Sequence, residues 1–449
     1  MSIASDVVGH PFKKYIMNWN TIHFIENKKA VFCGDKLVLM PLKEDQYDIL
    51  SQYQLSDDKA AVSDNVQQVV HAFEEYIDNI PDIEPGAKSG NGYVSRIMLC
   101  ISNDCNLRCK YCYASGGSYG VQRGLMTRET ADLFVDFCKR NFKKIDKIIF
   151  FGGEPLLNYK LIDYICTRFE VEQFGLYPKF GIITNGTIMT SGVLAVLKKH
   201  IKFITVSVDG PESVNDINRV FENGSGSFSK IISFISAIKH NTDIEIHYEA
   251  TFTEEHVRQG FNYETLTAVL NDVTGISGDV VAESSMKADF LLDYLNGITK
   301  DNMLSSNFGN MPSDFWPVFN TIIRRRKEDM CGIGRDSFSV TYDGKIYLCH
   351  ITNNASKCLV QSIADDVDYT DNPFYHKDFA DNEKCRDCWG KNICGSCPVV
   401  RFYNADNGDF GREPRIAYCS DALRLLDVLL GIIVTIRTDK DLWSNIKKQ

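Results

Sequence analysis

The sequence predicts an α/β protein built around a partial (β/α)6 barrel, with a small α+β module before it and a cysteine-rich domain after it. Three observations along the 449 residues support this. Strand and helix patterns alternate from Tyr93 to about residue 300, which specifies a parallel sheet covered by helices. Short strands and an amphipathic helix pattern precede that region, and the alternation stops where cysteines return. We therefore expect domains at residues 1–92, 93–300 and 301–449.

The first domain is expected to hold three short strands followed by helices. The strand-like segments are residues 21–26, 30–33 and 36–40. An apolar stripe at helical spacing follows them: Val66, Val69, Val70, Phe73 and Ile77. Glu84–Gly92 contains a proline and several glycines, so we expect it to be the linker to the barrel.

Six strands are expected in the barrel, near residues 95–101, 147–151, 180–184, 203–208, 244–251 and 278–283. Helices lie between them, such as Thr127–Phe142, whose inward face is expected to carry Ala131, Phe134, Val135 and Cys138. Three more isolated cysteines are expected in the core: Cys33, Cys100 and Cys166. Because β/α folds place their chemistry in loops after the strands, residues following the first two strands are candidates for a site.

Composition limits the possible partners and compartment. The formal charge is −10, whereas a broad nucleic-acid-binding face needs a basic surface, so we expect no nucleic-acid partner. The compact basic run Arg324–Lys327 is expected on a solvated helix face. Met1–Lys14 lacks a signal-peptide core, and the apolar stretch Leu425–Ile436 is too short to cross a bilayer, so we expect a cytoplasmic protein without a membrane partner. In a reducing compartment, fifteen cysteines indicate metal ligation before disulfides.

A cysteine triplet follows the first barrel strand. It reads Cys105-Asn-Leu-Arg-Cys109-Lys-Tyr-Cys112, and a Gly-Gly-Glu-Pro turn at residues 152–155 follows the second strand. Iron–sulfur clusters usually take four cysteine thiolates, so three close cysteines leave one iron open to another ligand. A zinc knuckle is the alternative, because Cys-x-x-Cys spacings also suit tetrahedral zinc. A zinc site would not require the Gly-Gly-Glu-Pro turn.

The CxxxCxxC spacing, with an aromatic residue before the last cysteine, resembles the motif of radical S-adenosylmethionine (SAM) enzymes. The resemblance implies that Cys105, Cys109 and Cys112 bind three irons of a 4Fe-4S cluster, and that SAM chelates the fourth through its amino and carboxylate groups. One electron, from an external reductant such as flavodoxin or ferredoxin, would cleave SAM to a 5′-deoxyadenosyl radical. The cofactor supplies the chemistry, and the protein orients it and excludes water.

The same resemblance implies further SAM contacts. Gly152 and Gly153 would form the turn beside SAM, and Glu154 would accept a hydrogen bond from the methionine ammonium. Tyr111 would present its backbone to adenine. Arg219 would pair with the SAM carboxylate, for which a guanidinium fork is suited.

Three loop residues complete this expected site. Ser207 and Asp209, in Ser207-Val-Asp209-Gly-Pro, would meet ribose or methionine, and Asn185 would be another contact. The alternative for each is a loop side chain that caps its own turn.

A second set of cysteines resembles the SPASM extension, a domain that carries auxiliary iron–sulfur clusters in peptide-modifying radical SAM enzymes. Its seven members, with Gly344 in the expected place, are Cys331, Cys349, Cys385, Cys388, Cys394, Cys397 and Cys419. The Cys394–Cys397 step is one residue shorter than usual, which leaves open which cluster each of these two serves. A double zinc ribbon is the structural alternative.

The resemblance implies two auxiliary 4Fe-4S clusters. The distal one would use Cys385, Cys388, Cys394 and Cys419. The proximal one would use Cys331, Cys349 and Cys397, and either Cys358 or a substrate thiolate could supply its fourth ligand. Cys358 as an ordinary cysteine is the alternative, because it lies outside the seven-cysteine pattern.

The residue after Cys349 bears on the reaction. Sulfatase maturases place an Asp there as a base, whereas this chain has His350. The segments Gly344–His350 and Cys385–Cys394 look closer to thioether-forming peptide maturases. His350 is therefore the candidate catalytic residue, since histidine moves protons near neutral pH. A structural hydrogen-bonding role is the alternative.

The first domain is compatible with the winged-helix-like module with which many such maturases recognise a precursor peptide. That module binds a leader peptide as an added strand, and holding the leader raises the effective concentration of the core peptide at the barrel. We therefore expect an oxidoreductase that matures a ribosomally made peptide by abstracting a hydrogen from a residue carbon and joining that carbon to a cysteine sulfur. A carbon–carbon crosslinking cyclase, a sulfatase-type maturase and a non-catalytic iron–sulfur peptide-binding protein remain alternatives.

Overall fold

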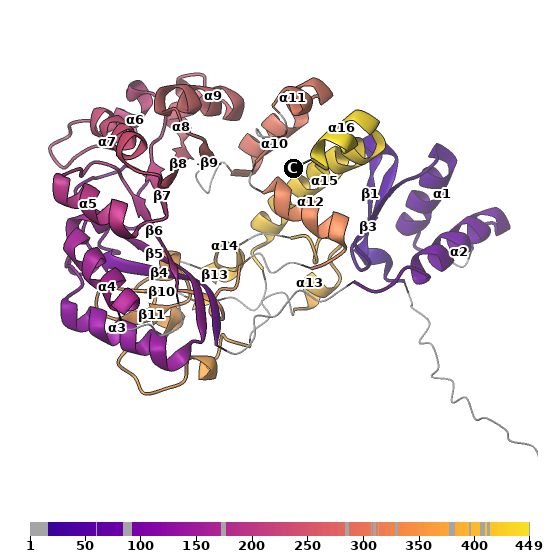
Figure 1. Ribbon diagram of the computed structural model, residues 1–449. Coiled ribbons are helices and arrows are strands. Elements are labelled where there is room, and N and C mark those ends of the chain that lie inside the picture. Colours follow the sequence, from indigo (N-terminus) through magenta and orange to yellow (C-terminus); the bar gives the residue numbers. More distant parts are fainter. Residues whose placement is uncertain are drawn as a thin grey trace, which may run out of the picture.

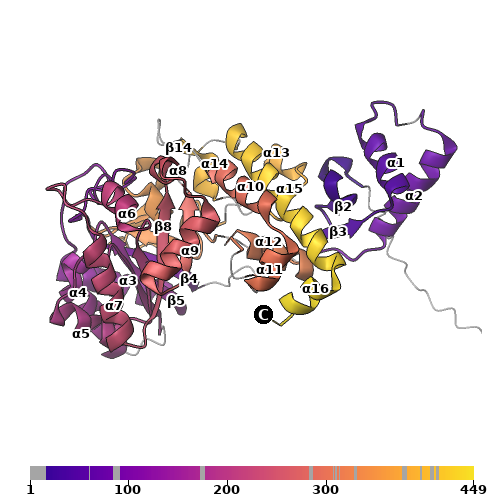
Figure 2. The ribbon, with the colours of Figure 1, turned by 90° about the horizontal axis from the view of Figure 1, so that it is seen from above.

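The computed structural model describes residues 17–59, 61–83, 92–171, 177–282, 287–306, 308, 311–312, 314–327, 331–376, 382–394, 397–404, 409–410 and 414–448. Residues 17–83, which we call the front module, are drawn in indigo in Figure 1. They lie at the opposite end of the molecule from the barrel, and Figure 2 shows the C-terminal helices between the two. The expected linker lies outside the described residues, apart from Gly92.

The front module is a three-stranded antiparallel sheet covered by two helices. Its strands, in the order β1-β2-β3, are β1 (Ile22–Ile25), β2 (Ala30–Cys33) and β3 (Val38–Pro41). The helices are α1 (Glu44–Leu55) and α2 (Asp64–Asp78). Val70, Phe73 and Ile77 of the expected stripe are buried against Trp19 and Leu50. The apolar spacing therefore identified the inward face of α2 correctly.

The barrel contains all six expected strands, in chain order and parallel. They are β4 (Tyr93–Ser102), β5 (Lys144–Gly152), β6 (Lys179–Thr184), β7 (Phe203–Ser207), β8 (Glu245–Phe252) and β9 (Gly278–Ala282). The helices between them are α3 (Arg128–Asn141), α4 (Tyr159–Val171), α5 (Ser191–His200), α6 (Glu212–Asn218), α7 (Phe228–Asn241), α8 (Glu254–Arg258) and α9 (Tyr263–Thr274).

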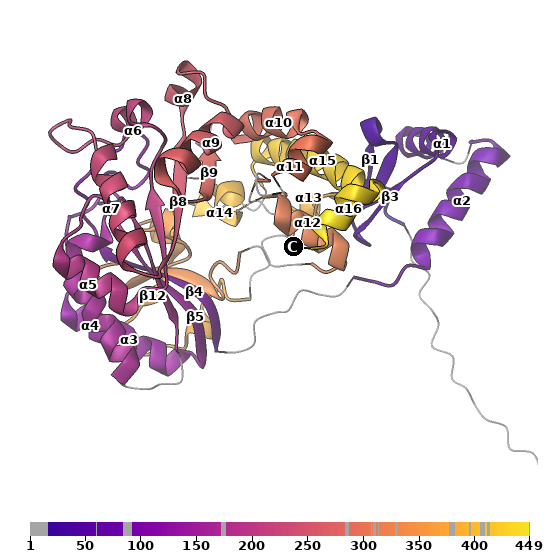
Figure 3. The same cartoon turned by 45° about the horizontal axis from the view of Figure 1, so that its top comes forward.

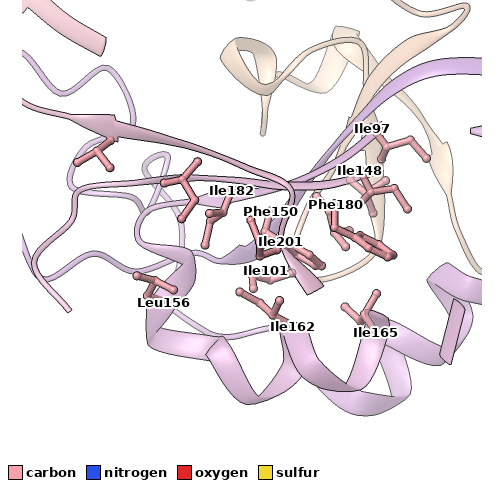
Figure 4. Packing of buried hydrophobic residues seen from close by; sticks show 14 of the residues in the cluster. Ile97, Ile101, Ile148, Phe150, Leu156, Ile162, Ile165, Phe180, Ile182 and Ile201 are labelled. Atoms are coloured by element: carbon pink, nitrogen blue, oxygen red, sulfur yellow. The ribbon is translucent and has the colours of Figure 1, made fainter. Parts of the chain in front are cut away.

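The barrel core lies between the sheet and its covering helices. Figure 4 shows Ile162 and Ile165 of α4 packed under Ile148, Phe150 and Phe180 from the sheet. On α3 the expected inward residues are buried, and Thr127 caps the helix by accepting from the Thr130 backbone N–H. The cysteines assigned to the core from their apolar neighbours are also buried: Cys33, Cys100, Cys138 and Cys166.

The sheet continues beyond the barrel. Strands β10 (Ser337–Val340), β11 (Lys345–Tyr347) and β12 (Leu359–Ser362) join it, giving the order β12-β11-β10-β4-β5-β6-β7-β8-β9. β10 pairs in parallel with β4, with Ser337 opposite Arg96 and Val340 opposite Leu99. The cysteine-rich region and the barrel therefore share one sheet. This arrangement places Cys349, which follows β11, close to the first barrel strand.

Helices form most of the remaining C-terminal region. They are α10 (Lys287–Gly297), α11 (Lys300–Ser305), α12 (Phe315–Arg324), α13 (Glu383–Arg386), α14 (Pro398–Phe402), α15 (Ile416–Thr438) and α16 (Lys440–Ile446), with the short pair β13 (Tyr403–Asn404) and β14 (Asp409–Phe410). Figure 3 shows α10, α15 and α16 between the barrel and the front module. None of the helices in the described residues has both the length and the apolar character needed to cross a membrane.

A second apolar cluster joins these helices to the front module. Leu430 and Ile433 of α15 belong to the same cluster as Ile25, Phe32 and Leu39 from the strands. The basic run that we expected on a solvated helix face lies instead at the end of α12. Arg325 takes a left-handed conformation there, and its guanidinium donates to the carbonyls of Lys36 and Pro81. That expectation was wrong for Arg325, because its guanidinium is hydrogen-bonded to the backbone of the front module.

Candidate functional site

The cysteine triplet lies in the loop that follows β4. Cys105, Cys109 and Cys112 are all partly exposed, and backbone N–H groups point at two of their sulfurs. Leu107 N–H donates to the Cys105 sulfur at 3.4 Å, and Gly116 N–H donates to the Cys112 sulfur at 3.4 Å. Hydrogen bonds to cysteine sulfur are a means by which proteins stabilise cluster thiolates.

The Gly-Gly turn packs directly against this loop. Gly153 N–H donates to the Ser102 carbonyl at 2.9 Å, and Glu154 N–H donates to the Asp104 carbonyl at 2.8 Å. A Cβ on Gly152 would lie 2.1 Å from the Ser102 carbonyl oxygen, and one on Gly153 would lie 2.2 Å from that of Asp104. The two glycines are therefore required for the close approach of two backbones just before the first cysteine.

Glu154 is completely buried at the end of β5. One carboxylate oxygen accepts from Leu156 N–H at 2.9 Å and from the Thr184 hydroxyl at 2.7 Å, and the other accepts from Asn185 N–H at 2.8 Å. Burial raises the pKa of Glu154 to about 7, although these hydrogen bonds oppose the shift. The carboxylate therefore ties β5 to β6.

Asn185 caps its own turn, which is one of the two roles that the sequence left open, and its contact with SAM stays a prediction. Its side-chain carbonyl accepts from Thr187 N–H at 3.0 Å, so it caps its own turn. Its amide donates to Asn106 Oδ1 at 2.9 Å and points at the Cys105 sulfur at 3.6 Å. The same side chain therefore also reaches the cysteine loop.

Asp209, Tyr111 and Arg219 form a buried polar group at the end of β7. The Tyr111 hydroxyl donates to the Asp209 carboxylate, at 2.7 and 2.9 Å from its two oxygens. Arg219 Nη1 donates to the same hydroxyl and lies 3.7 Å from Asp209 Oδ1. Tyr111 thus contributes its side chain, whereas the sequence suggested a role only for its backbone. Ser207 is half-buried at the last position of β7.

Backbone pairing explains why Arg219 lies beside the cysteines. Arg108 N–H donates to the Val220 carbonyl at 2.7 Å, and Lys110 N–H donates to the Asn218 carbonyl at 3.0 Å. The segment that ends α6 is thereby fixed along the cysteine loop. Arg219 Nε is buried and has no hydrogen-bond partner among the described residues.

His256 is a positioning residue that the sequence analysis missed. Its Nδ1 accepts from Thr253 N–H at 2.9 Å, so its Nε2 carries the proton and donates to the Asp209 carbonyl oxygen. The ring also stacks on Phe252, with 5.0 Å between centroids. The one available signal was the Thr253-Glu-Glu-His256 start of α8, where a residue that caps the helix turn is expected.

These residues fit a SAM molecule on a cluster at the triplet. Three cysteines on one loop can bind three of the irons of a four-iron cluster and leave the fourth iron for another ligand. Backbone N–H groups donate to two of the three sulfurs. The unpartnered Nε of Arg219 suits an anionic group, and Glu154 offers a buried carboxylate on the Gly-Gly turn. The individual SAM contacts remain predictions.

The second cysteine field separates into two groups. Cys385, Cys388, Cys394 and Cys419 line one cavity of about 290 Å³. Within the described residues, no three His, Cys, Asp or Glu side chains surround a single point closely enough for one metal ion. The four cysteines that share the cavity are those expected for the distal cluster, and their ligation stays a prediction.

Arg401 enters the same cavity and was not anticipated. It is 8% exposed, and its Nη2 donates to the Cys385 sulfur at 2.9 Å. Its pKa is raised because the effect of the cysteines outweighs burial, which acts in the opposite direction. A cation held against a cluster ligand stabilises negative charge on the cluster.

The other group surrounds the end of β11. Cys331, Cys349 and Cys397 pack in one apolar cluster with Leu348 and the fully buried Cys358. Cys394 and Cys397 thus belong to different groups despite the short step between them. Cys358 lies in the same cluster as these three cysteines, and its role as a fourth ligand stays a prediction.

His350 lies between the two cysteine regions. Its Nδ1 is 3.5 Å from the Cys349 sulfur, and its ring packs edge-on against Phe151 and Tyr113 at 5.0 and 6.2 Å between centroids. Burial lowers the pKa of His350 to about 4. The imidazole is therefore neutral at pH 7 but is a weaker base than an ordinary histidine.

Another cavity lies away from this chemistry. It measures about 560 Å³ between α9, α10 and α11, with Phe252, Phe290 and Tyr294 among its lining. None of the expected ligands is among the described residues that line it.

Comparison with known proteins agrees with this geometry. Residues 99–263 match the Radical SAM superfamily. The radical SAM cyclopropyl synthase TigE of Paramaledivibacter caminithermalis is 28% identical over 314 residues, covering 65% of this chain and 64% of that protein. The cysteine-type anaerobic sulfatase-maturating enzyme of Clostridium perfringens is 24% identical over 359 residues, covering 70% of this chain and 91% of that protein.

A solved structure shows the same fold. Native anSMEcpe, with bound AdoMet and Kp18Cys peptide, superposes with a TM-score of 0.61 at 19% identity, over 76% of this chain and 99% of that one. Residues 99–263, which match the Radical SAM superfamily, contain the cysteine triplet, the Gly-Gly turn and Arg219. These findings identify residues 99–263 as a radical SAM domain.

Proposed function

We propose that this chain is a maturase that abstracts a hydrogen atom from a residue of a ribosomally made peptide and joins the resulting carbon to a cysteine sulfur of the same peptide. One observation carries the proposal. The triplet loop, with Arg219 and Glu154 beside it, lies on the same sheet as Cys349, because β10 and β11 extend the barrel from β4. A site for SAM and a second cysteine group therefore belong to one structural unit.

The residues around the triplet would bind and orient SAM. Glu154 would accept from its ammonium, and the buried Nε of Arg219 would donate to its carboxylate. Asp209 and Tyr111 hold Arg219 in place. When bound, SAM and its cluster supply a 5′-deoxyadenosyl radical after reduction by an external one-electron donor such as flavodoxin or ferredoxin.

Thioether formation breaks a C–H bond and an S–H bond of the peptide and forms a C–S bond. The hydrogen atom would leave with 5′-deoxyadenosine, and the thiol proton would pass to a base. Cys331, Cys349 and Cys397 would hold a proximal cluster that could accept the remaining electron. Neutral His350 is the candidate proton acceptor beside Cys349, although its pKa of about 4 makes it a weak one.

The front module would hold the leader of the precursor. Adding a strand to a sheet edge supplies main-chain hydrogen bonds, and β1 and β3 are the two edges here. Arg437 Nη1 already donates to the Leu39 carbonyl at 2.7 Å, and Gln54 Nε2 donates to the Ile22 carbonyl at 2.8 Å. A leader strand would therefore share these carbonyls or displace the two side chains.

Carbon–carbon bond formation is the second candidate. The relative TigE is named a cyclopropyl synthase, and closing a cyclopropyl ring joins two carbons. The same initial hydrogen abstraction serves either outcome, because the two reactions differ in the atom that meets the substrate radical.

The mass of a modified peptide distinguishes these candidates. A cysteine-containing peptide encoded beside this gene would be expressed anaerobically with the enzyme and alkylated before intact-mass analysis. Loss of two hydrogens together with one alkylatable thiol supports the thioether. Loss of two hydrogens with every thiol still reactive supports a carbon–carbon bond.

The matched control is the Cys105→Ala/Cys109→Ala/Cys112→Ala variant, which should form no 5′-deoxyadenosine while retaining auxiliary iron. An unmodified peptide together with active SAM cleavage by the wild-type enzyme contradicts the proposed substrate. SAM cleavage by the triple variant contradicts the assignment of the site.

A further inference from the structure

The front module rests on the short loop between two cysteines of the distal group. Trp389 follows Cys388 and lies flat against His23 of β1, with 3.8 Å between ring centroids and 8° between ring planes. His23 Nε2 also contacts Asp427 Oδ1 of α15 at 2.7 Å. Phe32 of β2 meets the indole edge-on at 6.4 Å. The indole is therefore shared by two strands of the module.

The turn after β2 contacts the same loop. Asn392 Nδ2 donates to the Gly34 carbonyl at 2.8 Å, and Lys391 pairs with Asp35. A Cβ on Gly34 would lie 2.1 Å from the Trp389 carbonyl oxygen, so the two backbones are in close contact. Residues 389–392 thus form a platform for β1, β2 and the start of the turn that follows β2.

Both ends of this platform are cysteines that line the 290 Å³ cavity. Cys388 precedes Trp389, and Cys394 follows Ile393. Bound to one cluster, the two cysteines would close the loop into a short ring and restrict its backbone. Metal binding is coupled to local folding in this way, because the unfilled site lacks the bonds that hold its ligand loops.

Other contacts hold β3 and the turn that precedes it. Arg437 of α15 donates to the Leu39 carbonyl of β3, and Arg325 donates to the Lys36 carbonyl. Neither arginine lies in the segment between Cys388 and Cys394. Loss of the cluster is therefore expected to loosen β1 and β2 and to leave β3 attached to α15.

We propose that filling the four-cysteine site fixes residues 389–392 as the docking platform of the front module, so that assembly of the distal cluster and docking of the module are coupled. The proposal rests on the distal cluster of the proposed function. Coupling of this kind is reciprocal: a cluster that favours the docked module is itself retained better when the module is docked.

Hydrogen exchange of the full chain tests the first direction. Cys419→Ala removes a ligand supplied by α15 and leaves the platform sequence unchanged. We expect the amides of residues 22–35 to exchange about tenfold faster than in the iron-loaded wild type, since losing a stacked aromatic contact permits local opening. Amides of residues 38–41 should change less.

The matched control is the Cys105→Ala/Cys109→Ala/Cys112→Ala variant, which removes the other iron site. It should leave exchange in residues 22–35 as in the wild type. Equal protection of these residues in Cys419→Ala and wild type overturns the proposal, as does equal loss in both cysteine variants. Iron analysis comes first: wild type without distal iron contradicts the proposed cluster itself, whereas an iron-loaded site without an exchange difference contradicts only the coupling.

Gly34→Val tests the reverse direction without touching a cysteine. Its side chain would push against the Trp389 carbonyl, so iron release to a chelator should be faster than in wild type. Gly297→Val is the control, because a Cβ there meets no atom within 4 Å. His23→Ala provides a milder variant if Gly34→Val folds poorly. Unchanged iron release in both Gly34→Val and His23→Ala contradicts reciprocity and overturns the coupling.

Discussion

Replacing Asp209 with asparagine tests the network that joins the cysteine loop to the barrel. The Asp209 side chain is fully buried and accepts from the Tyr111 hydroxyl and, at 3.1 Å, from Thr251 N–H. Its charge faces Arg219 at 3.7 Å, and that guanidinium is 8% exposed. Asparagine retains the shape but removes the charge, so Arg219 would remain buried without its carboxylate.

The expected loss of stability follows from that burial. Removing one partner of a buried ion pair costs about 3 to 5 kcal/mol, because the other charge stays desolvated and uncompensated. The amide introduced by Asp209→Asn would also direct N–H groups at the donors around it, which leaves hydrogen bonds unmade. We expect a loss of about 3 kcal/mol and weaker SAM binding, because Tyr111 loses its carboxylate acceptor and Arg219 loses its ion-pair partner.

Urea denaturation and SAM titration of the iron-loaded chain measure these effects. Because a chain of 449 residues need not unfold in one step, the comparison uses the unfolding transition of the barrel. Glu222→Gln is the control: its pair with Arg108 is 3.1 Å long, but the carboxylate is 80% exposed. Such a surface pair contributes less than about 1 kcal/mol. If Asp209→Asn unfolds like Glu222→Gln and binds SAM normally, the reasoning about this network is refuted.

Three further predictions concern the charges at the two sites. SAM should bind about tenfold more tightly at pH 8 than at pH 6, because Glu154, with a pKa of about 7, must ionise to accept a hydrogen bond from the ammonium. Glu154→Gln should remove this pH dependence from SAM titrations. Burial raises the pKa of Glu154 above its value in the unfolded chain. The contribution of Glu154 to stability is therefore complete below the unfolded pKa and is lost as the pH rises through about 7. Glu154→Gln should remove this loss from unfolding curves measured at different pH values. Arg401→Met should make the distal cluster harder to reduce, because it removes the cation that donates to the Cys385 sulfur. A redox titration followed by electron paramagnetic resonance measures the reduction potential, and Arg424→Met, at an exposed position, is the control. An unchanged potential in Arg401→Met contradicts the role of Arg401.

The sequence alone determined the secondary structure of the barrel and indicated a radical SAM domain. The six strands and the inward face of α3 were predictable because apolar residues recur at the period of each element, which is a local property of the chain. The cysteine triplet was equally local, since three ligands on one loop need no distant partner to be recognised. The match of residues 99–263 to the Radical SAM superfamily agrees with that interpretation.

Only the tertiary structure decided which distant residues meet. β10 has four residues, too few for a periodic pattern to reveal that it extends the barrel sheet beside β4. The position of Arg401 in its cavity was equally unpredictable, because a lone arginine in sequence does not indicate which sulfur it faces.

The interior of the site was decided in the same way. Tyr111 and Asp209 are 98 residues apart, and their hydrogen bond depends on the parallel order of the strands that bring their loops to one edge. His256 reaches the same Asp209 from α8. Such contacts are absent from any local pattern, because burial and hydrogen bonding between loops arise only once the sheet has assembled and the chain is folded around it.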